Sequence, residues 1–174
     1  MPQEWEKSGF EINPVHIQYL RENKKHITVF DRIAAIGGQF DLITMRGVIE
    51  HIPDHTELIT FLSQHLAPGG AVFITATPDI SSVCSTLYKS KWNQVVCPEH
   101  IHQFSSTSLS ILLTRAGLVL RSLNHPYMGT PYADWSNDKA RFADNLQKLQ
   151  QDANADIAPI HAFAGNMISA LFEK

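Results

Sequence analysis

The chain has 174 residues, of which 44% are hydrophobic, and this length and composition suit one domain with a substantial core. Its formal net charge of -3 gives no reason to expect a nucleic acid as the main partner. The sequence contains no apolar run long enough to cross a bilayer, and its first residues do not resemble a signal peptide. The two cysteines, Cys84 and Cys97, are expected to be free thiols in a reducing compartment, which predicts a cytoplasmic protein.

The N-terminal part of the chain predicts two short strands with a helix between them. The first strand is expected within 5–10, and Asn13 then suits the N-cap of a helix that starts at Pro14. Apolar residues at helical spacing continue this helix to the polar stretch 22–25. The run 26–31 predicts the second strand.

The central stretch predicts the order strand, helix, strand. The apolar run that opens at residue 40 ends at an Arg-Gly turn, and Asp54 with Glu57 three residues later forms the pattern of a capping box. The helix is expected to end at 66–70, and the run 71–77 predicts the next buried strand. This order is that of a βαβ unit in a parallel sheet.

The C-terminal half continues the alternation of helices and strands. An irregular stretch is expected from 78 to 104, followed by a helix that starts near Ser105 and ends at Gly117. The sequence then predicts a strand at 118–123, a helical insert at about 137–152 and a final strand at 166–172. Taken together, the elements predict an α/β fold with a mostly parallel sheet.

Two motifs of the central unit resemble a known family. Residues 40–54 read FDLITMRGVIEHIPD and residues 66–70 read LAPGG. These motifs resemble the stretch around the fourth and fifth strands of class I S-adenosylmethionine-dependent methyltransferases, and the order of elements matches that family along nearly the whole chain. The resemblance implies a Rossmann-like sheet with an antiparallel last strand. It also implies methyl transfer from S-adenosylmethionine to a small-molecule or lipid-like acceptor, with no nucleic acid as partner.

The first strand of that family and its glycine-rich loop have no counterpart in this sequence. We therefore expect a single methyltransferase-like domain over 1–174 whose N-terminal side is incomplete, and weak binding of S-adenosylmethionine. The alternative is a non-catalytic remnant that acts as a binding or dimerisation module, with a homodimer formed through the incomplete sheet.

The resemblance also implies five cofactor-binding residues. Glu11, at the end of the first strand, would accept hydrogen bonds from the ribose hydroxyls, and Asp31 would receive the adenine amino group with Arg32 beside the ring. Met45 and Arg46 would line the pocket at the end of the next strand. Each has an ordinary structural alternative: a helix-start or turn acid for Glu11 and Asp31, a core side chain for Met45 and a solvated end residue for Arg46.

Polar residues after the central strand and in the later loop are the catalytic candidates. His51 could act as a general base for a substrate hydroxyl, and His100 lies in a Pro-Glu-His stretch that resembles the same subfamily. In ubiquinone-biosynthesis O-methyltransferases a Glu-x-x-Glu-His pattern is linked to a divalent metal. Gly47 stands where the first Glu would be, so we assign no metal ligand. A metal-dependent hydrolase using Glu50, His51, His100 and His102 is a weaker hypothesis, and the simplest alternative is that Glu50 and His51 only hold the loop.

Overall fold

The computed structural model describes residues 4–95 and 98–174, and the chain separates into two compact units, Met1–Gln39 and Phe40–Lys174. Cys84 is a free, buried thiol, as expected, whereas Cys97 lies outside the described residues. The prediction of a single domain over the whole chain stays a prediction. In the described parts of the chain, no helix is long and apolar enough to span a membrane.

The N-terminal unit consists of a parallel strand pair joined by one helix. Strands β1 (Ser8–Phe10) and β2 (Thr28–Phe30) pair directly, and helix α1 (Pro14–Asn23) connects them. The Asn13 side chain accepts a hydrogen bond from the backbone N–H of Val15, which satisfies one of the free amides at the start of the helix. A short 3₁₀ helix, η1 (Ile33–Ala35), follows β2.

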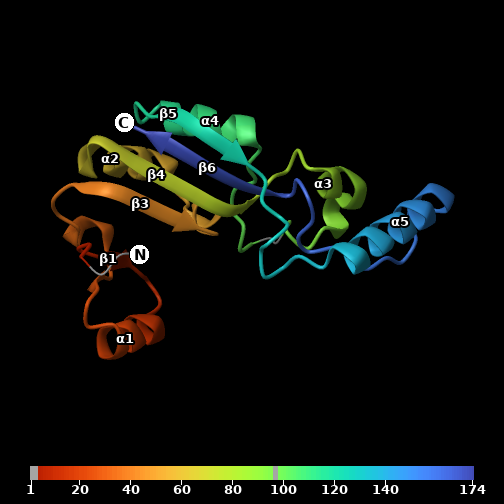
Figure 1. Ribbon diagram of the computed structural model, residues 1–174, viewed down its shortest axis with the longest axis horizontal. Helices are drawn as coiled ribbons and strands as arrows, with labels where there is room; N and C mark the ends of the chain where they lie inside the picture. The colour runs from red at the N-terminus through yellow and green to blue at the C-terminus, as the bar shows by residue number, and fades with distance from the viewer. Residues whose placement is uncertain (1–3, 96–97) are drawn as a thin grey trace. The chain divides into compact units, whose positions relative to one another are not determined.

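The larger unit is built on a four-stranded sheet in the order β3-β4-β6-β5 (Figure 1). Its strands are β3 (Phe40–Arg46), β4 (Leu66–Pro78), β5 (Val119–Asn124) and β6 (Met167–Glu173). Strand β3 is parallel to β4, and β6 is antiparallel to both β4 and β5, so β6 alone runs against the other three. This arrangement confirms the predicted α/β fold with an antiparallel last strand.

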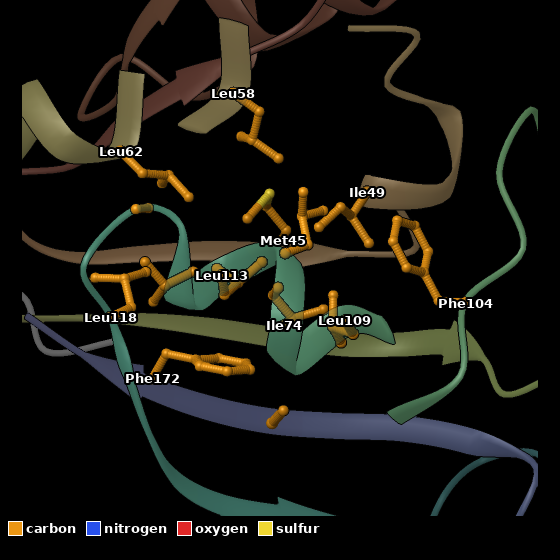
Figure 2. Packing of buried hydrophobic residues seen from close by; sticks show 14 of the residues in the cluster. Met45, Ile49, Leu58, Leu62, Ile74, Phe104, Leu109, Leu113, Leu118 and Phe172 are labelled. Atoms are coloured by element: carbon orange, nitrogen blue, oxygen red, sulfur yellow. The ribbon is translucent and has the colours of Figure 1, made fainter. Parts of the chain in front are cut away.

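Helices α2 (His55–His65) and α4 (Ser106–Thr114) pack their apolar side chains on this sheet. The Asp54 side chain accepts hydrogen bonds from the backbone N–H groups of Thr56 and Glu57, and Ser105 forms a capping box with Ser108. Figure 2 shows how leucines of both helices meet Met45 and Ile74 of the strands. The labelled helix leucines are Leu58, Leu62, Leu109 and Leu113.

Strand β4 starts earlier than the sequence predicts and contains a bulge. Leu66 already pairs with Phe40, and the register then shifts so that Ala71 faces Leu42. A second shift lies between Thr75 and Thr77 on the side that pairs with β6. Ala76 is the extra residue and adopts a positive φ of 60°, a conformation that costs a residue with a Cβ about 1–2 kcal/mol.

Beyond the end of the sheet lies a second, smaller core formed by helices α3 (Val83–Tyr88) and α5 (Trp135–Gln151) (Figure 1). The sequence predicts the α5 segment as helical but treats 78–104 as irregular, so α3 and the short η3 (Lys89–Lys91) are missed. The α3 side chains Cys84 and Tyr88, one helical turn apart, are buried with Trp92 and Ile160. Tertiary burial of one face therefore stabilises a helix that is too short to be evident from its sequence.

Candidate functional site

The acids predicted to bind the cofactor lie at the strand ends of the N-terminal unit. Glu11 follows β1, and its Oε1 accepts hydrogen bonds from the backbone N–H groups of Ile12 and Asn13, both at 2.8 Å. The Asn13 bond is the main reason that the pKa of Glu11 lies below its ordinary value, with Ile12 and His16 adding to the effect against some desolvation. The carboxylate is therefore ionised, and its Oε2 lies 3.6 Å from His16 Nδ1.

Asp31 and Arg32 directly follow β2. Asp31 forms an ion pair with Arg21 at 3.4 Å, and both side chains are about half exposed. Arg32 is exposed and precedes η1 in an extended conformation. The two residues therefore present charged groups next to the strand end, as the resemblance implies, but their roles toward a cofactor stay predictions.

Met45 and Arg46 end β3 in the larger unit and differ in their surroundings. Met45 is buried in the core of Figure 2, which matches its structural alternative. Arg46 is exposed, and its Nη2 donates a hydrogen bond of 2.6 Å to the hydroxyl of Tyr132 in the insert between β5 and β6. The insert segment therefore reaches the C-terminal end of β3.

Glu50, His51 and His100 form a histidine cluster at this edge of the larger unit. Each residue offers one ligand atom, and these atoms all lie within 4.8 Å of one another. Glu50 is 2% exposed and accepts a hydrogen bond of 3.1 Å from Thr77 Oγ1. The short helix η2 (Ile49–His51) holds the first two residues, and Gly47 with its positive φ of 57° makes the turn before it.

Backbone carbonyls determine which nitrogen of each cluster histidine carries the proton. His51 Nδ1 lies 2.7 Å from the carbonyl oxygen of Glu99, and His100 Nδ1 lies 2.7 Å from that of Gln94. Because a carbonyl oxygen can only accept, both Nδ1 atoms are donors. When the rings are neutral, Nε2 of each carries the lone pair, and among the described residues no hydrogen bond engages it, so it can accept a proton or a metal ion.

His102 and the aromatic residues of the loop before it do not join the histidine cluster. His102 packs against His55 with ring centroids 4.0 Å apart, and burial together with this neighbour lowers the pKa of His55. Tyr88 and Trp92 are buried in the second core, where Trp92 Nε1 donates to the carbonyl oxygen of Ile160. These two aromatic residues therefore anchor the loop.

A second polar group at the same edge was missed by the sequence reasoning. Asp79 comes directly after β4 and is 2% exposed, and its Oδ2 lies 2.9 Å from Nε2 of His125, which comes directly after β5. Ser106 Oγ donates to the same Oδ2 at 2.6 Å, while Ser81 binds Oδ1 through its N–H and its hydroxyl. Parallel strands end at one edge of a sheet, so polar residues that directly follow them were the available signal.

Hydrogen bonds keep Asp79 ionised in spite of its burial. Desolvation alone would raise the pKa of this carboxyl group, but the bonds from Ser106, Ser81 and His125 outweigh it, and the pKa lies below its ordinary value. We call Asp79, Ser81, Ser106 and His125 the Asp79 group. It stabilises a buried negative charge beside the edge where β4 and β5 end.

The sequence matches a family model described as a methyltransferase domain over residues 2–123. Among curated relatives, the ubiquinone biosynthesis O-methyltransferase of Xanthomonas axonopodis pv. citri (strain 306) is 27% identical over 127 residues, which are 69% of this chain and 50% of the relative. That of Xylella fastidiosa (strain 9a5c) is 26% identical over 119 residues, 66% of this chain and 46% of the relative. The chain thus spans about half the length of the curated relatives it matches.

Solved structures show the same fold at low sequence identity. A methyltransferase of Methanosarcina mazei described as SAM-dependent is 14% identical, with a TM-score of 0.58 over 96% of this chain and 81% of that protein. The N-methyltransferase NodS of Bradyrhizobium japonicum WM9, solved with S-adenosyl-L-homocysteine, is 18% identical with a TM-score of 0.53, over 96% of this chain and 65% of that protein. Since the family model covers well over half of the sequence, the chain belongs to the methyltransferase domain family.

Proposed function

We propose that this chain acts in methyl transfer from S-adenosylmethionine to a small-molecule or lipid-like acceptor. The observation that carries the proposal is the family match over residues 2–123, which includes Glu11, Asp31 and the end of β3. Relatives named ubiquinone biosynthesis O-methyltransferases and a solved neighbour with S-adenosyl-L-homocysteine support it. Bound S-adenosylmethionine would supply an electrophilic methyl group.

The residues present at the end of β1 suit the ribose of this cofactor. Glu11 is ionised, and the backbone amides engage its Oε1 rather than its Oε2. An ionised carboxylate accepts hydrogen bonds from hydroxyl groups at roughly twice the strength of a neutral acceptor. Asp31 and Arg32, which follow β2, would face the adenine. Of the two candidates at the end of β3, exposed Arg46 keeps its proposed role, whereas Met45 is a core residue.

His51 and His100 are the proposed catalytic residues. Nε2 of either ring can take the proton of a hydroxyl group on the acceptor while the oxygen of that group attacks the methyl carbon. Positioning of the acceptor against the methyl group supplies most of the rate enhancement in such a displacement.

A divalent cation at the histidine cluster is a second candidate role, favoured by the three ligand atoms within 4.8 Å. Two imidazole nitrogens and one carboxylate leave open positions on a metal, which could hold an acceptor oxygen. A thermal melt of the purified protein with and without Zn²⁺ tests this role. A rise in Tm that is lost in His100→Ala supports it, and an unchanged melt contradicts it.

The main proposal is tested by titrating the purified protein with S-adenosylmethionine and by measuring methyl transfer to a panel of hydroxylated acceptors. We expect Glu11→Gln to weaken cofactor binding about 10-fold or more, because it removes a charged hydrogen-bond acceptor. Glu6→Gln is the matched control, since Glu6 is exposed and precedes β1, whereas Glu11 follows the other end of that strand. Equal effects of the two substitutions would refute the assignment of Glu11.

A non-catalytic binding or dimerisation module is the alternative from a different class. It predicts no saturable cofactor binding together with a homodimer whose population grows with concentration. Light scattering over a range of concentrations distinguishes it from a monomeric enzyme. Binding of a nucleic acid is not expected, and a gel-shift titration at low salt checks that expectation.

A further inference from the structure

A pocket of about 610 Å³ lies next to the Asp79 group in the larger unit. Its residues come from the segment after β5, the start of α5 and the segment before β6, so they gather at the edge where β5 ends and β6 begins. The pocket is mostly apolar and falls within the size range of small-molecule sites. Its lining consists of His125, Tyr127, Met128, Trp135 and Ala164.

The ring of His125 has one nitrogen held by the protein and one that is not. Nε2 lies 2.9 Å from Oδ2 of ionised Asp79, so Nε2 carries the proton and donates it to the carboxylate. Within residues 4–95 and 98–174, Nδ1 makes no hydrogen bond. When the ring is neutral, Nδ1 therefore carries its lone pair and is a hydrogen-bond acceptor on a residue that lines the pocket.

This group does not have the geometry of a serine hydrolase. Ser106 Oγ lies 3.1 Å from His125 Nε2, the same nitrogen that binds Asp79, whereas a catalytic serine needs the opposite nitrogen of the ring. The Ser106 hydroxyl proton is directed to Asp79 Oδ2 at 2.6 Å. Ser106 therefore helps to fix the carboxylate and is not an activated nucleophile.

Tyr127 contributes a wall to the pocket rather than a second polar group. Its hydroxyl donates to Asp138 at 2.6 Å and accepts from the backbone N–H of Asp134 at 3.1 Å. Desolvation, together with Asp138, raises the pKa of Tyr127 to about 12, so the hydroxyl stays protonated and engaged.

Stacked aromatic rings give the pocket a rigid flat side. Trp135 lies parallel to Phe163 with ring centroids 5.8 Å apart and an interplanar angle of 9°, and Tyr127 meets both rings edge to face. Trp135 is still 45% exposed, so part of its surface is available to a ligand. Met128 is 70% exposed on the same pocket, and a flexible thioether there can adapt to a bound ring.

We propose that this pocket binds the methyl acceptor as a flat, largely apolar ring that bears a hydroxyl group, and that the hydroxyl donates its hydrogen bond to Nδ1 of His125. The ring lies against Trp135, and Asp79 acts as a positioning residue because it keeps the proton on the far nitrogen. That the ring is a methyl acceptor rests on the proposed methyl transfer, whereas binding of the ring itself requires no cofactor.

The test uses two probes, 4-tert-butylphenol and its methyl ether 4-tert-butylanisole, in which one O-methyl group replaces the hydrogen-bond donor. Tryptophan fluorescence of the purified protein, without cofactor, measures the Kd of each probe. We expect the phenol to bind about tenfold more tightly than the ether, the effect of one hydrogen bond. Trp135→Phe should abolish the fluorescence change, since neither of the other two tryptophans, Trp5 and the buried Trp92, lines the pocket.

His125→Phe should bring the ratio of the Kd of the ether to the Kd of the phenol to about one, because the substitution keeps a ring and removes the acceptor nitrogen. As a measurement that needs no variant, the Nδ1 resonance of His125 in the wild-type protein, labelled with ¹⁵N-histidine, should shift with the phenol and not with the ether. Equal binding of the two probes, or no binding of either, would overturn the proposal. If the preference holds but no acceptor is methylated and no cofactor binds, the proposed function fails and the hydroxyl site stands.

Discussion

Replacing Asp79 by Asn tests the energetic role of the buried carboxylate. The change keeps the shape of the side chain but replaces the charged carboxylate, which accepts hydrogen bonds from His125 and Ser106, by a neutral amide. A bond to a charged group contributes about 1.5–3 kcal/mol and a neutral one about half as much. Exchanging two charged bonds for neutral ones therefore predicts a loss of about 1.5–3 kcal/mol in the free energy of unfolding.

Urea denaturation at neutral pH measures this loss as a lower midpoint at an unchanged m-value. Asp144→Asn is the control, because Asp144 is an exposed residue that forms an ion pair with Lys148 one turn along α5, and loss of such a pair costs about 0.5 kcal/mol or less. Equal stability of Asp79→Asn and the wild type would refute the reasoning that the carboxylate is ionised and stabilising.

The same pair of proteins predicts a dependence on pH. Since the folded-state pKa of Asp79 lies below its unfolded value, its contribution is present above the unfolded value of about 3.9 and is lost as the pH falls through the folded value. The difference in stability between wild type and Asp79→Asn should therefore disappear in strong acid. A difference that grows as the pH falls would contradict the sign of the shift.

Three other substitutions have expected outcomes that urea denaturation can check. Leu62→Ala, at a fully buried core position, should cost about 2–5 kcal/mol, and a loss below 1 kcal/mol would mean that the core collapses around the cavity. Gly70→Ala should cost about 1–3 kcal/mol, because its Cβ would lie 2.9 Å from a carbonyl oxygen, whereas Gly37→Ala, with nothing within 4 Å, should be nearly neutral. Tyr127→Phe should cost about 1–3 kcal/mol, because it removes the hydroxyl group that donates to buried Asp138. Since the pKa of Tyr127 is raised to about 12, the free energy of unfolding of the wild type should fall as the pH rises from the ordinary tyrosine pKa of about 10 to that value.

The parts of the fold that were predicted well are those with strong local signals at both ends. The unit from β3 to β4 has an Arg-Gly turn and the Asp54 cap, and each signal acts on its own neighbours in the chain. The early start of β4 at Leu66 was missed because its pairing with Phe40 is decided across the sheet. Helix α3 was missed for the related reason that burial of Cys84 and Tyr88 depends on distant residues.

The candidate site likewise has residues that a local motif predicts and residues that only the fold brings together. Glu50 and His51 stand out because they adjoin a recognisable motif, and His100 stands out because of the Pro-Glu-His stretch. That His100 joins the other two within 4.8 Å is a property of the folded loop. Asp79 and His125 are 46 residues apart and belong to no motif, so only the topology of the sheet brings them together.

The bulge at Ala76 has a consequence for how the length of β4 can change. Thr77 and Asp79 follow the bulge by one and three residues, and they bind Glu50 and His125 respectively. Side chains along an extended strand point alternately to opposite faces, so a residue added or lost at a regular position reverses the direction of everything that follows. The bulge is an exception, because Thr75 pairs with Ser169 and Thr77 pairs with the adjacent residue of β6, Ile168, so the two threonines already alternate as neighbours would. A deletion of Ala76 should therefore relieve its positive φ and keep Thr77 and Asp79 on their present faces, whereas a deletion within the regular part of β4 should turn both side chains to the opposite face.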